Sequence, residues 1–89
     1  MSNYLLIRHK VRDFDHWKSG YEGHLNTRES AGLTEKHVLR SNEDQNEVVL
    51  LFEAADLGKA RAFIASPELR NIMQEHGVIG MPDFSFLND

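Results

Sequence analysis

The chain has 89 residues, enough for one small domain spanning residues 1–89, and it contains no cysteine. Ten Lys and Arg residues against 14 Asp and Glu residues give a formal net charge of −4, which argues against nucleic-acid binding because that requires a basic surface. The composition also excludes disulfides and thiolate sites. The absence of a long apolar run and of a signal-peptide core predicts a cytoplasmic protein that does not enter membranes.

The first half of the chain predicts a strand, a helix and a second strand. Asn3 to Val11 is rich in Tyr, Leu, Ile and Val, which favours a strand. Asp13 is a suitable N-cap for a helix that ends at Gly32. The apolar stripe of that helix recurs at helical spacing and comprises Phe14, Trp17, Tyr21, Leu25 and Arg28, with His24 at its edge. Leu33 to Arg40 predicts the second strand.

The second half predicts a strand, an interrupted helical region and a last strand. Glu47 to Ala54 is the third strand, and Asp56 caps the helical region that follows it. Ser66-Pro67 interrupts and restarts this region, because Ser is a good N-cap and Pro suits the first helical position. Val78 to Leu87 predicts the last strand, in which Pro82 requires an edge position or a bulge.

The resulting order β-α-β-β-α-β predicts an α+β protein of the ferredoxin-like type, with a four-stranded antiparallel sheet and helices on one face. The first and third strands are the expected central pair. Their helix-facing side chains are Leu5, Ile7, His9, Val11, Val48, Leu50, Phe52 and Ala54. Their other face carries Tyr4, Leu6, Arg8, Lys10, Val49, Leu51 and Glu53, with Glu53 expected to pair with Arg8 or Lys10. Because no helix covers this second face, we expect a homodimer formed through it, sheet to sheet.

Several motifs, occurring in order, resemble the dimeric α/β-barrel superfamily, in particular antibiotic-biosynthesis monooxygenases and small polyketide cyclases. They are Asp13-Phe14-Asp15-x-Trp17-Lys18, Tyr21-x-x-His24-x-x-x-Arg28, His37-Val38-Leu39-Arg40, Phe52-Glu53-Ala54, Ala62-Phe63, Ser66-Pro67-Glu68-Leu69 and Gly77-Val78-x-Gly80-x-Pro82. The resemblance implies a dimeric barrel with one small-molecule cleft per subunit, between helices and sheet. Members of the superfamily include oxygenases, cyclases, isomerases, stress proteins and ligand sensors, so the fold does not select one activity.

Six residues are predicted to line this cleft. Four come from the first helix and two from helix-facing positions of the first two strands: Trp17, Tyr21, His24, Arg28, His9 and His37. The apolar floor is expected to contain Leu5, Ile7, Leu50 and Phe52. A mainly apolar cleft with a few convergent polar groups is typical of small-molecule sites.

Each of these residues also has a structural interpretation. His24 would hydrogen-bond a neighbouring carbonyl, and His9 would be a buried histidine with satisfied hydrogen bonds. Arg28 would cap carbonyls at the helix end, and Trp17 would belong to the core. Outside the cleft, His16 is expected at the surface, and His76 at a helix end, where a cation offsets the helix dipole.

Metal and haem are not expected. A metal site would require His9, His24 and His37 to converge, since no pair of ligands has the spacing of a helical metal motif. The resembling haem-degrading enzymes carry a Trp near the helix that precedes the axial histidine, whereas the only Trp here is Trp17, so haem bound through His76 is disfavoured.

Two function hypotheses follow. In the first, the protein is an enzyme, and the resemblance implies oxygenation or cyclisation or isomerisation of an aromatic or polyketide-like compound without a bound cofactor. His37 or His24 would remove a proton, and Arg28 and Tyr21 would stabilise the resulting enolate. In the second, the same cleft serves a non-catalytic ligand-binding or stress-response protein. A cleft filled by Trp17, Phe63 and Met73 would favour the second hypothesis.

Overall fold

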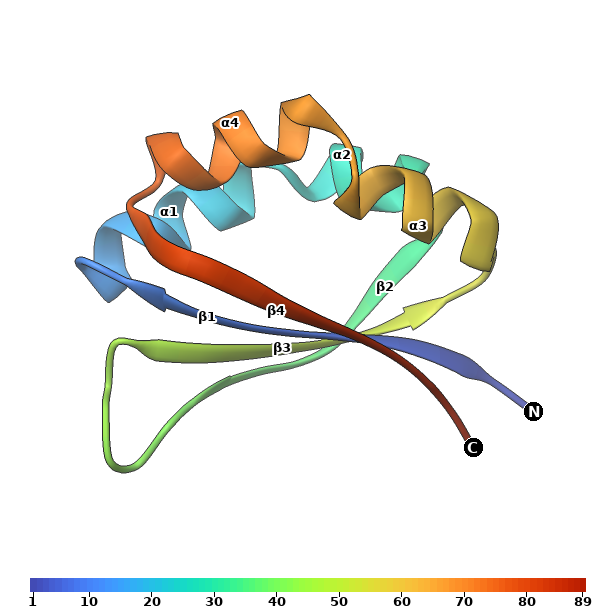
Figure 1. The fold of residues 1–89 in the computed structure, drawn as a ribbon, viewed down its shortest axis with the longest axis horizontal. Coiled ribbons are helices and arrows are strands. Elements are labelled where there is room, and N and C mark those ends of the chain that lie inside the picture. The colour runs from blue at the N-terminus through green and yellow to red at the C-terminus, as the bar shows by residue number, and fades with distance from the viewer.

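A computed structural model describes all residues 1–89 and contains one sheet covered by four short helices. In chain order the elements are β1 (Asn3–Val11), α1 (Phe14–Gly23), α2 (Leu25–Ser30), β2 (Leu33–Arg40), β3 (Glu47–Ala54), α3 (Leu57–Ile64), α4 (Pro67–Glu75) and β4 (Val78–Asn88). The strand order is β2-β3-β1-β4 and every pairing is antiparallel. Figure 1 shows all four helices on one side of the sheet. The predicted ferredoxin-like α+β fold is confirmed.

The helices begin where the capping residues predict. The side chain of Asp13 accepts a hydrogen bond from the amide of Asp15, and that of Asp56 accepts one from Lys59. Ser66 caps α4 in the same way, with Pro67 as its first residue. The predicted interruption of the second helical region at Ser66-Pro67 is therefore confirmed. No helix is long and apolar enough to cross a membrane.

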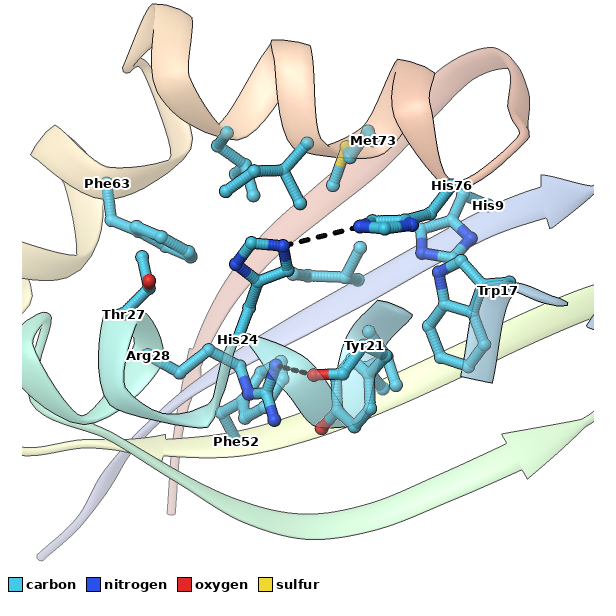
Figure 2. A pocket seen from close by; sticks show the side chains of 14 residues that line it. His9, Trp17, Tyr21, His24, Thr27, Arg28, Phe52, Phe63, Met73 and His76 are labelled. Atoms are coloured by element: carbon cyan, nitrogen blue, oxygen red, sulfur yellow. Dashed lines mark hydrogen bonds between the residues drawn. The ribbon is translucent and has the colours of Figure 1, made fainter. Parts of the chain in front are cut away.

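The first helical region differs from the single predicted helix, because it breaks at His24. The φ of −111° and ψ of 26° at this residue end α1, and α2 begins at the next residue. Gly20 and Gly23 make the end of α1 a poor helix former. The side chain of Arg28 then reaches back and donates a 2.6 Å hydrogen bond to the carbonyl of Tyr21, which also accepts one from the amide of His24 at the break. His24 and Arg28, four residues apart, remain on the same side of the helical layer despite the break (Figure 2).

The face of the sheet beneath the helices is the core. The eight residues expected on this face of β1 and β3 are all buried, each no more than 4% exposed. Antiparallel pairing aligns them, for example Leu5 with Phe52 and Ile7 with Leu50. Trp17 and Tyr21 of α1 and Ala60 of α3 complete the cluster from above. The period-two alternation along both central strands is thus confirmed.

Strand β2 contains a β-bulge that overturns one expectation. The register pairs Glu35 with Phe52 but His37 with Leu51, which leaves Lys36 without an opposite residue. One extra residue reverses the alternation of side chains beyond it. Glu35 therefore lies on the helix-covered face and His37 on the other. The prediction that His37 faces the cleft is wrong, because it assumed unbroken alternation along the strand.

The face without helices, which we call the open face, combines apolar and charged side chains. Leu6, Val49 and Leu51 are only half-buried on it, and Leu39 is 52% exposed. Three ion pairs lie among them: Arg8–Glu47 at 2.7 Å, Lys10–Asp44 at 3.4 Å and Lys36–Glu53 at 3.1 Å. The expected pairing of Glu53 with Arg8 or Lys10 is wrong, because the register places Glu53 opposite Tyr4 and Thr34. Pro82 lies in β4, at the edge of the sheet, as predicted.

Candidate functional site

A cavity lies between the covered face of the sheet and the helices. Its volume is about 60 Å³, room for a few water molecules, and part of its wall is open to solvent. Fourteen residues line it, nine of them hydrophobic: Ile7, His9, Trp17, Tyr21, His24, Thr27, Arg28, Leu50, Phe52, Phe63, Leu69, Ile72, Met73 and His76. Figure 2 shows these side chains converging from α1, α2, α4 and the sheet.

The floor and roof of the cavity are apolar. Ile7, Leu50 and Phe52 form the floor, as expected, whereas Leu5 is buried in the core and does not line the cavity. Phe63 of α3 and Leu69, Ile72 and Met73 of α4 form the roof. The cavity is small and Trp17, Phe63 and Met73 line it, so any ligand larger than a few waters must displace a flexible side chain. Methionine adapts most easily to such a demand, because it is unbranched and has three rotatable bonds.

Five of the six predicted site residues line the cavity: His9, Trp17, Tyr21, His24 and Arg28. The sixth, His37, is exposed on the open face, beyond the bulge of β2, and contributes nothing to this cavity. The side chain that β2 does contribute to this neighbourhood is Glu35, whose carboxylate accepts a 2.6 Å hydrogen bond from the hydroxyl of Tyr21. One feature of the sequence indicates that Glu35 replaces His37 on the covered face. Leu33 and Val38 are both apolar but lie five residues apart, and an odd spacing puts two residues on opposite faces of a strand that has no bulge.

Arg28, Tyr21 and Glu35 form one polar network at the edge of the cavity. The guanidinium carbon of Arg28 lies 3.7 Å from the centroid of the Tyr21 ring, a cation–π contact. Burial, then the hydrogen bond to Glu35, raises the pKa of Tyr21, so its hydroxyl remains protonated and donates to Glu35. Burial also lowers the pKa of Arg28, which still remains charged because guanidinium pKa values are so high. The expected capping of helix-end carbonyls by Arg28 occurs at Tyr21, but from a buried position rather than from solvent.

His9 is the one buried side chain with an unused polar atom. It is 4% exposed, and its Nδ1 is buried with no hydrogen-bond partner. Desolvation by burial lowers its pKa to about 4, so the ring is neutral near pH 7. The ring packs edge-on against Trp17, at 5.4 Å between centroids, and Trp17 in turn stacks on Tyr21 at 4.9 Å. The expectation that a buried His9 has satisfied hydrogen bonds is wrong. An unpaired buried polar atom is costly, and because this nitrogen is itself buried, a ligand hydroxyl reaches it only if neighbouring side chains move.

A further polar part of the wall is a histidine pair. Nε2 of His24 lies 3.3 Å from Nε2 of His76, so one ring donates and the other accepts (Figure 2). The sequence placed His76 at the end of α4 but did not predict that it reaches the cavity. It does lie at the C-cap of α4, as expected. Its place in the stripe of Leu69, Ile72 and Met73 was the available signal.

One further histidine stands outside the cavity, beside the histidine pair. His16 of α1 is exposed, as predicted, and its ring centroid lies 6.1 Å from that of His76. No group of three His, Cys, Asp or Glu side chains is arranged to hold a metal ion. The metal alternative of His9, His24 and His37 does not form, because the sheet separates His37 from the other two.

A shallow groove runs along the outside of α4, against β4. Its volume is about 420 Å³. Leu69 and Met73 line this outer groove and the inner cavity alike. The rest of the groove is formed by Ile64, Arg70, Gln74, Val78, Gly80, Met81, Pro82 and Phe84. The two hollows are therefore neighbours, separated at this point by the side chains of one helix.

Comparison with known proteins identifies the fold. No protein-family profile matches the sequence, and no curated protein does. A Bordetella bronchiseptica protein assigned to the antibiotic biosynthesis monooxygenases superposes with a TM-score of 0.76 at 12% identity, over 100% of this chain and 98% of that one. SnoaB from Streptomyces nogalater, a cofactor-independent oxygenase, superposes with a TM-score of 0.74 at 13% identity, over 99% and 92% of the two chains. A conserved Methanosarcina mazei protein gives 0.71 at 12%, over 98% and 91%. The chain has the ferredoxin-like fold of these proteins, as the sequence motifs predicted.

Proposed function

We propose that the cavity binds a small aromatic molecule with an acidic hydroxyl or an activated C–H group. We further propose that the protein starts the oxygenation of this molecule by removing a proton, without a bound cofactor. The observation that carries the proposal is the His24–His76 pair, with Nε2 atoms 3.3 Å apart in the wall of an otherwise mostly apolar cavity. Histidine is the side chain that exchanges protons near neutral pH, and aromatic walls suit an aromatic ligand. The fold shared with a cofactor-independent oxygenase agrees with this choice.

In this proposal His24 is the general base, and Arg28 holds the anion that results. The positive guanidinium, a cavity-lining group, favours the deprotonated substrate electrostatically. Tyr21 takes a smaller part than expected, because its proton is already donated to Glu35. The unpartnered Nδ1 of His9 accepts a hydrogen bond from a second substrate hydroxyl.

The proposed reaction needs only molecular oxygen. The electron-rich carbanion gives one electron to O₂, and the two radicals combine to form a C–O bond. The peroxide takes up the proton held by the base and then loses water as its remaining C–H bond breaks. A CH₂ group and O₂ thus become a C=O group and H₂O, with carbon oxidised by four electrons and O₂ reduced by the same four. No external reductant enters the balance.

The test is oxygen consumption with a panel of small electron-rich phenols in buffer containing a chelator. We expect uptake of one O₂ per molecule converted, and ¹⁸O from labelled O₂ in the product carbonyl. His24→Phe should lower kcat roughly 100-fold or more, since a positioned general base contributes about that much. His37→Ala is the matched control, because this histidine is exposed on the opposite face, and its activity should equal that of the wild type.

The alternative, a non-catalytic binding protein, is an outcome of the same experiment. Saturable binding of the phenols, seen as a rise in Tm, with no oxygen uptake would assign the protein to that class. A ligand at 100 times its Kd stabilises the folded protein by about 2.7 kcal/mol, which such an assay detects easily. Absence of both binding and oxygen uptake across the panel would overturn the proposal.

We also propose that two copies of the chain pair through the open face. Leu6, Val49 and Leu51 line the middle of this face, and the ion pairs around them leave few unpaired charges to be desolvated. Such a pair would bury more than about 1,000 Å² in total. The cavity lies on the other side of the sheet, so pairing would leave its mouth free.

A further inference from the structure

We infer that His76 is a positioning residue, which holds His24 in the tautomer whose second nitrogen can take a proton from the cavity. This inference rests on the proposed function, because it assigns His24 the part of the base. His76 does not touch the reacting atoms in this arrangement. It acts only through the ring of His24.

The argument starts from the two nitrogens of His24. Nε2 points at Nε2 of His76, 3.3 Å away, while Nδ1 lies on the opposite side of the ring, toward Phe63 and Thr27 (Figure 2). A neutral imidazole has one N–H and one lone pair. For Nδ1 to accept a substrate proton, the N–H must be on Nε2. This requires His76 to be the acceptor of the pair, with its own hydrogen on Nδ1.

The same contact also stabilises the product of proton transfer. When His24 gains a proton it becomes a cation, and its Nε2–H then donates a charge-assisted hydrogen bond to His76. A base that is itself oriented by a second group is the general arrangement of activated proton acceptors in enzymes. The other titratable groups around the cavity are His9, Tyr21 and Arg28, and His16 lies on the outer side of His76. None of them accepts a hydrogen bond from the ring of His24.

Gly20 shows that the position of His76 is built into the fold. A Cβ added at Gly20 would lie 2.1 Å from Nδ1 of His76, so the imidazole packs directly against the backbone of α1. Glycine inside a helix costs about 0.5–1 kcal/mol relative to alanine. Space for the His76 ring is the physical reason for glycine at this position. Gly23, in the same helix, has nothing within 4 Å of such a Cβ and provides a matched control.

The first experiment is nitrogen-15 NMR of the histidine rings in the protein without substrate, at alkaline pH, where the imidazoles are neutral. We expect His24 to carry its hydrogen on Nε2 and His76 to carry its hydrogen on Nδ1. His76→Leu removes the acceptor, so His24 should become a mixture of both tautomers. His76→Gln restores an acceptor oxygen and should restore the single tautomer. A wild-type His24 with its hydrogen on Nδ1, or a tautomer unchanged in His76→Leu, would overturn the inference.

The second experiment uses the glycines. Gly20→Ala pushes the His76 ring away and should give the same mixed tautomer as His76→Leu, whereas Gly23→Ala should leave the nitrogen signals unchanged. If Gly20 had a purely structural role, Gly20→Ala would change the stability of the protein and leave the tautomer of His24 unchanged. That outcome would count against the inference.

Turnover gives the third readout. His76→Leu should lower kcat roughly 10-fold or more while KM changes little, and His76→Gln should recover part of the loss, since the base itself remains in place. His16→Ala, on the exposed side, is the control and should have wild-type kcat. If the wild-type protein converts no substrate, the proposed function fails, while the nitrogen signals still decide whether His76 sets the tautomer of His24.

Discussion

The two faces of the central strands differ although they alternate along the same residues. On the covered face Leu50 and Phe52 are almost completely buried, whereas their neighbours Val49 and Leu51 on the open face are half-buried. The covered face is closed by helices and encloses a cavity with one unpartnered polar atom, Nδ1 of His9. The open face has apolar side chains and three ion pairs but no covering layer. One sheet thus separates a small cavity beneath the helices from an open surface that no other part of the chain covers.

This contrast shows that the hydrophobicity of a strand alone does not indicate whether a face packs against the chain's own helices or against another molecule. Apolar residues on both sides of β3 meet two different partners: the chain's own helices on one side and, in our proposal, a second copy on the other. In this proposal, the free energy of folding comes mainly from the covered face, and the free energy of association comes from the open face. The predictions below test whether the two contributions separate in this way.

The largest expected effect is loss of an aromatic ring from the covered face. Phe52→Ala should lower the free energy of unfolding by about 3–5 kcal/mol, because it creates a cavity beneath the helices. In dilute protein, Leu51→Ala on the open face should cost only about 1 kcal/mol, since this side chain is half-exposed there. Urea unfolding of both variants measures the difference. Equal losses at low concentration would show that the two faces do not differ as described.

A charge on the open face should separate association from folding. Leu51→Asp places a carboxylate in the middle of the proposed contact and should weaken the dimer at least about 100-fold, or about 2.7 kcal/mol. Sedimentation velocity at micromolar concentration would give a dimer for wild type and a monomer for the variant. Leu25→Asp, at an exposed position on α2, is the control and should remain dimeric. A monomeric wild-type protein under these conditions would refute the proposed pairing.

The smallest effect concerns pH and belongs to the covered face. Desolvation lowers the pKa of His9 from its ordinary 6.5 to about 4, so between these values the unfolded chain binds a proton that the folded chain refuses. Stability from this residue is complete above about pH 6.5 and declines as pH falls, by about 2 kcal/mol at pH 5. His9→Phe should remove this part of the slope in unfolding measured from pH 7.5 to 5. An unchanged slope would mean that His9 is not desolvated.

The strands and helix starts could be predicted from the sequence because they depend on local patterns. Their β-favouring composition identified β1 and β3, and the capping residues Asp13, Asp56 and Ser66 each bond an amide two or three residues ahead. The central pairing of β1 with β3 followed from the fold type. These features need only short-range rules, and the structure confirms them.

Two parts of the site could not be predicted, since each depends on a structural feature that periodicity along the sequence does not determine. The bulge at Lys36 exchanges His37 for Glu35 on the covered face, and a helical wheel for α1 contains no information about β2. The contact of His24 with His76 spans 52 residues and requires both the helix break and the free space at Gly20. The sequence therefore predicted the site residues of a single helix better than it predicted contacts between residues of different elements.

The shared wall at α4 has a consequence for how a molecule would enter. Leu69 and Met73 line both the inner cavity and the outer groove, so these two side chains separate the hollows at this point. Methionine rotamers interconvert far faster than helices move, on picosecond to nanosecond timescales when unhindered. A ligand that arrives along the groove would therefore need only side-chain rotation to enter the cavity. Its rate of entry would be set by that rotation, and α4 would not have to move away from the sheet.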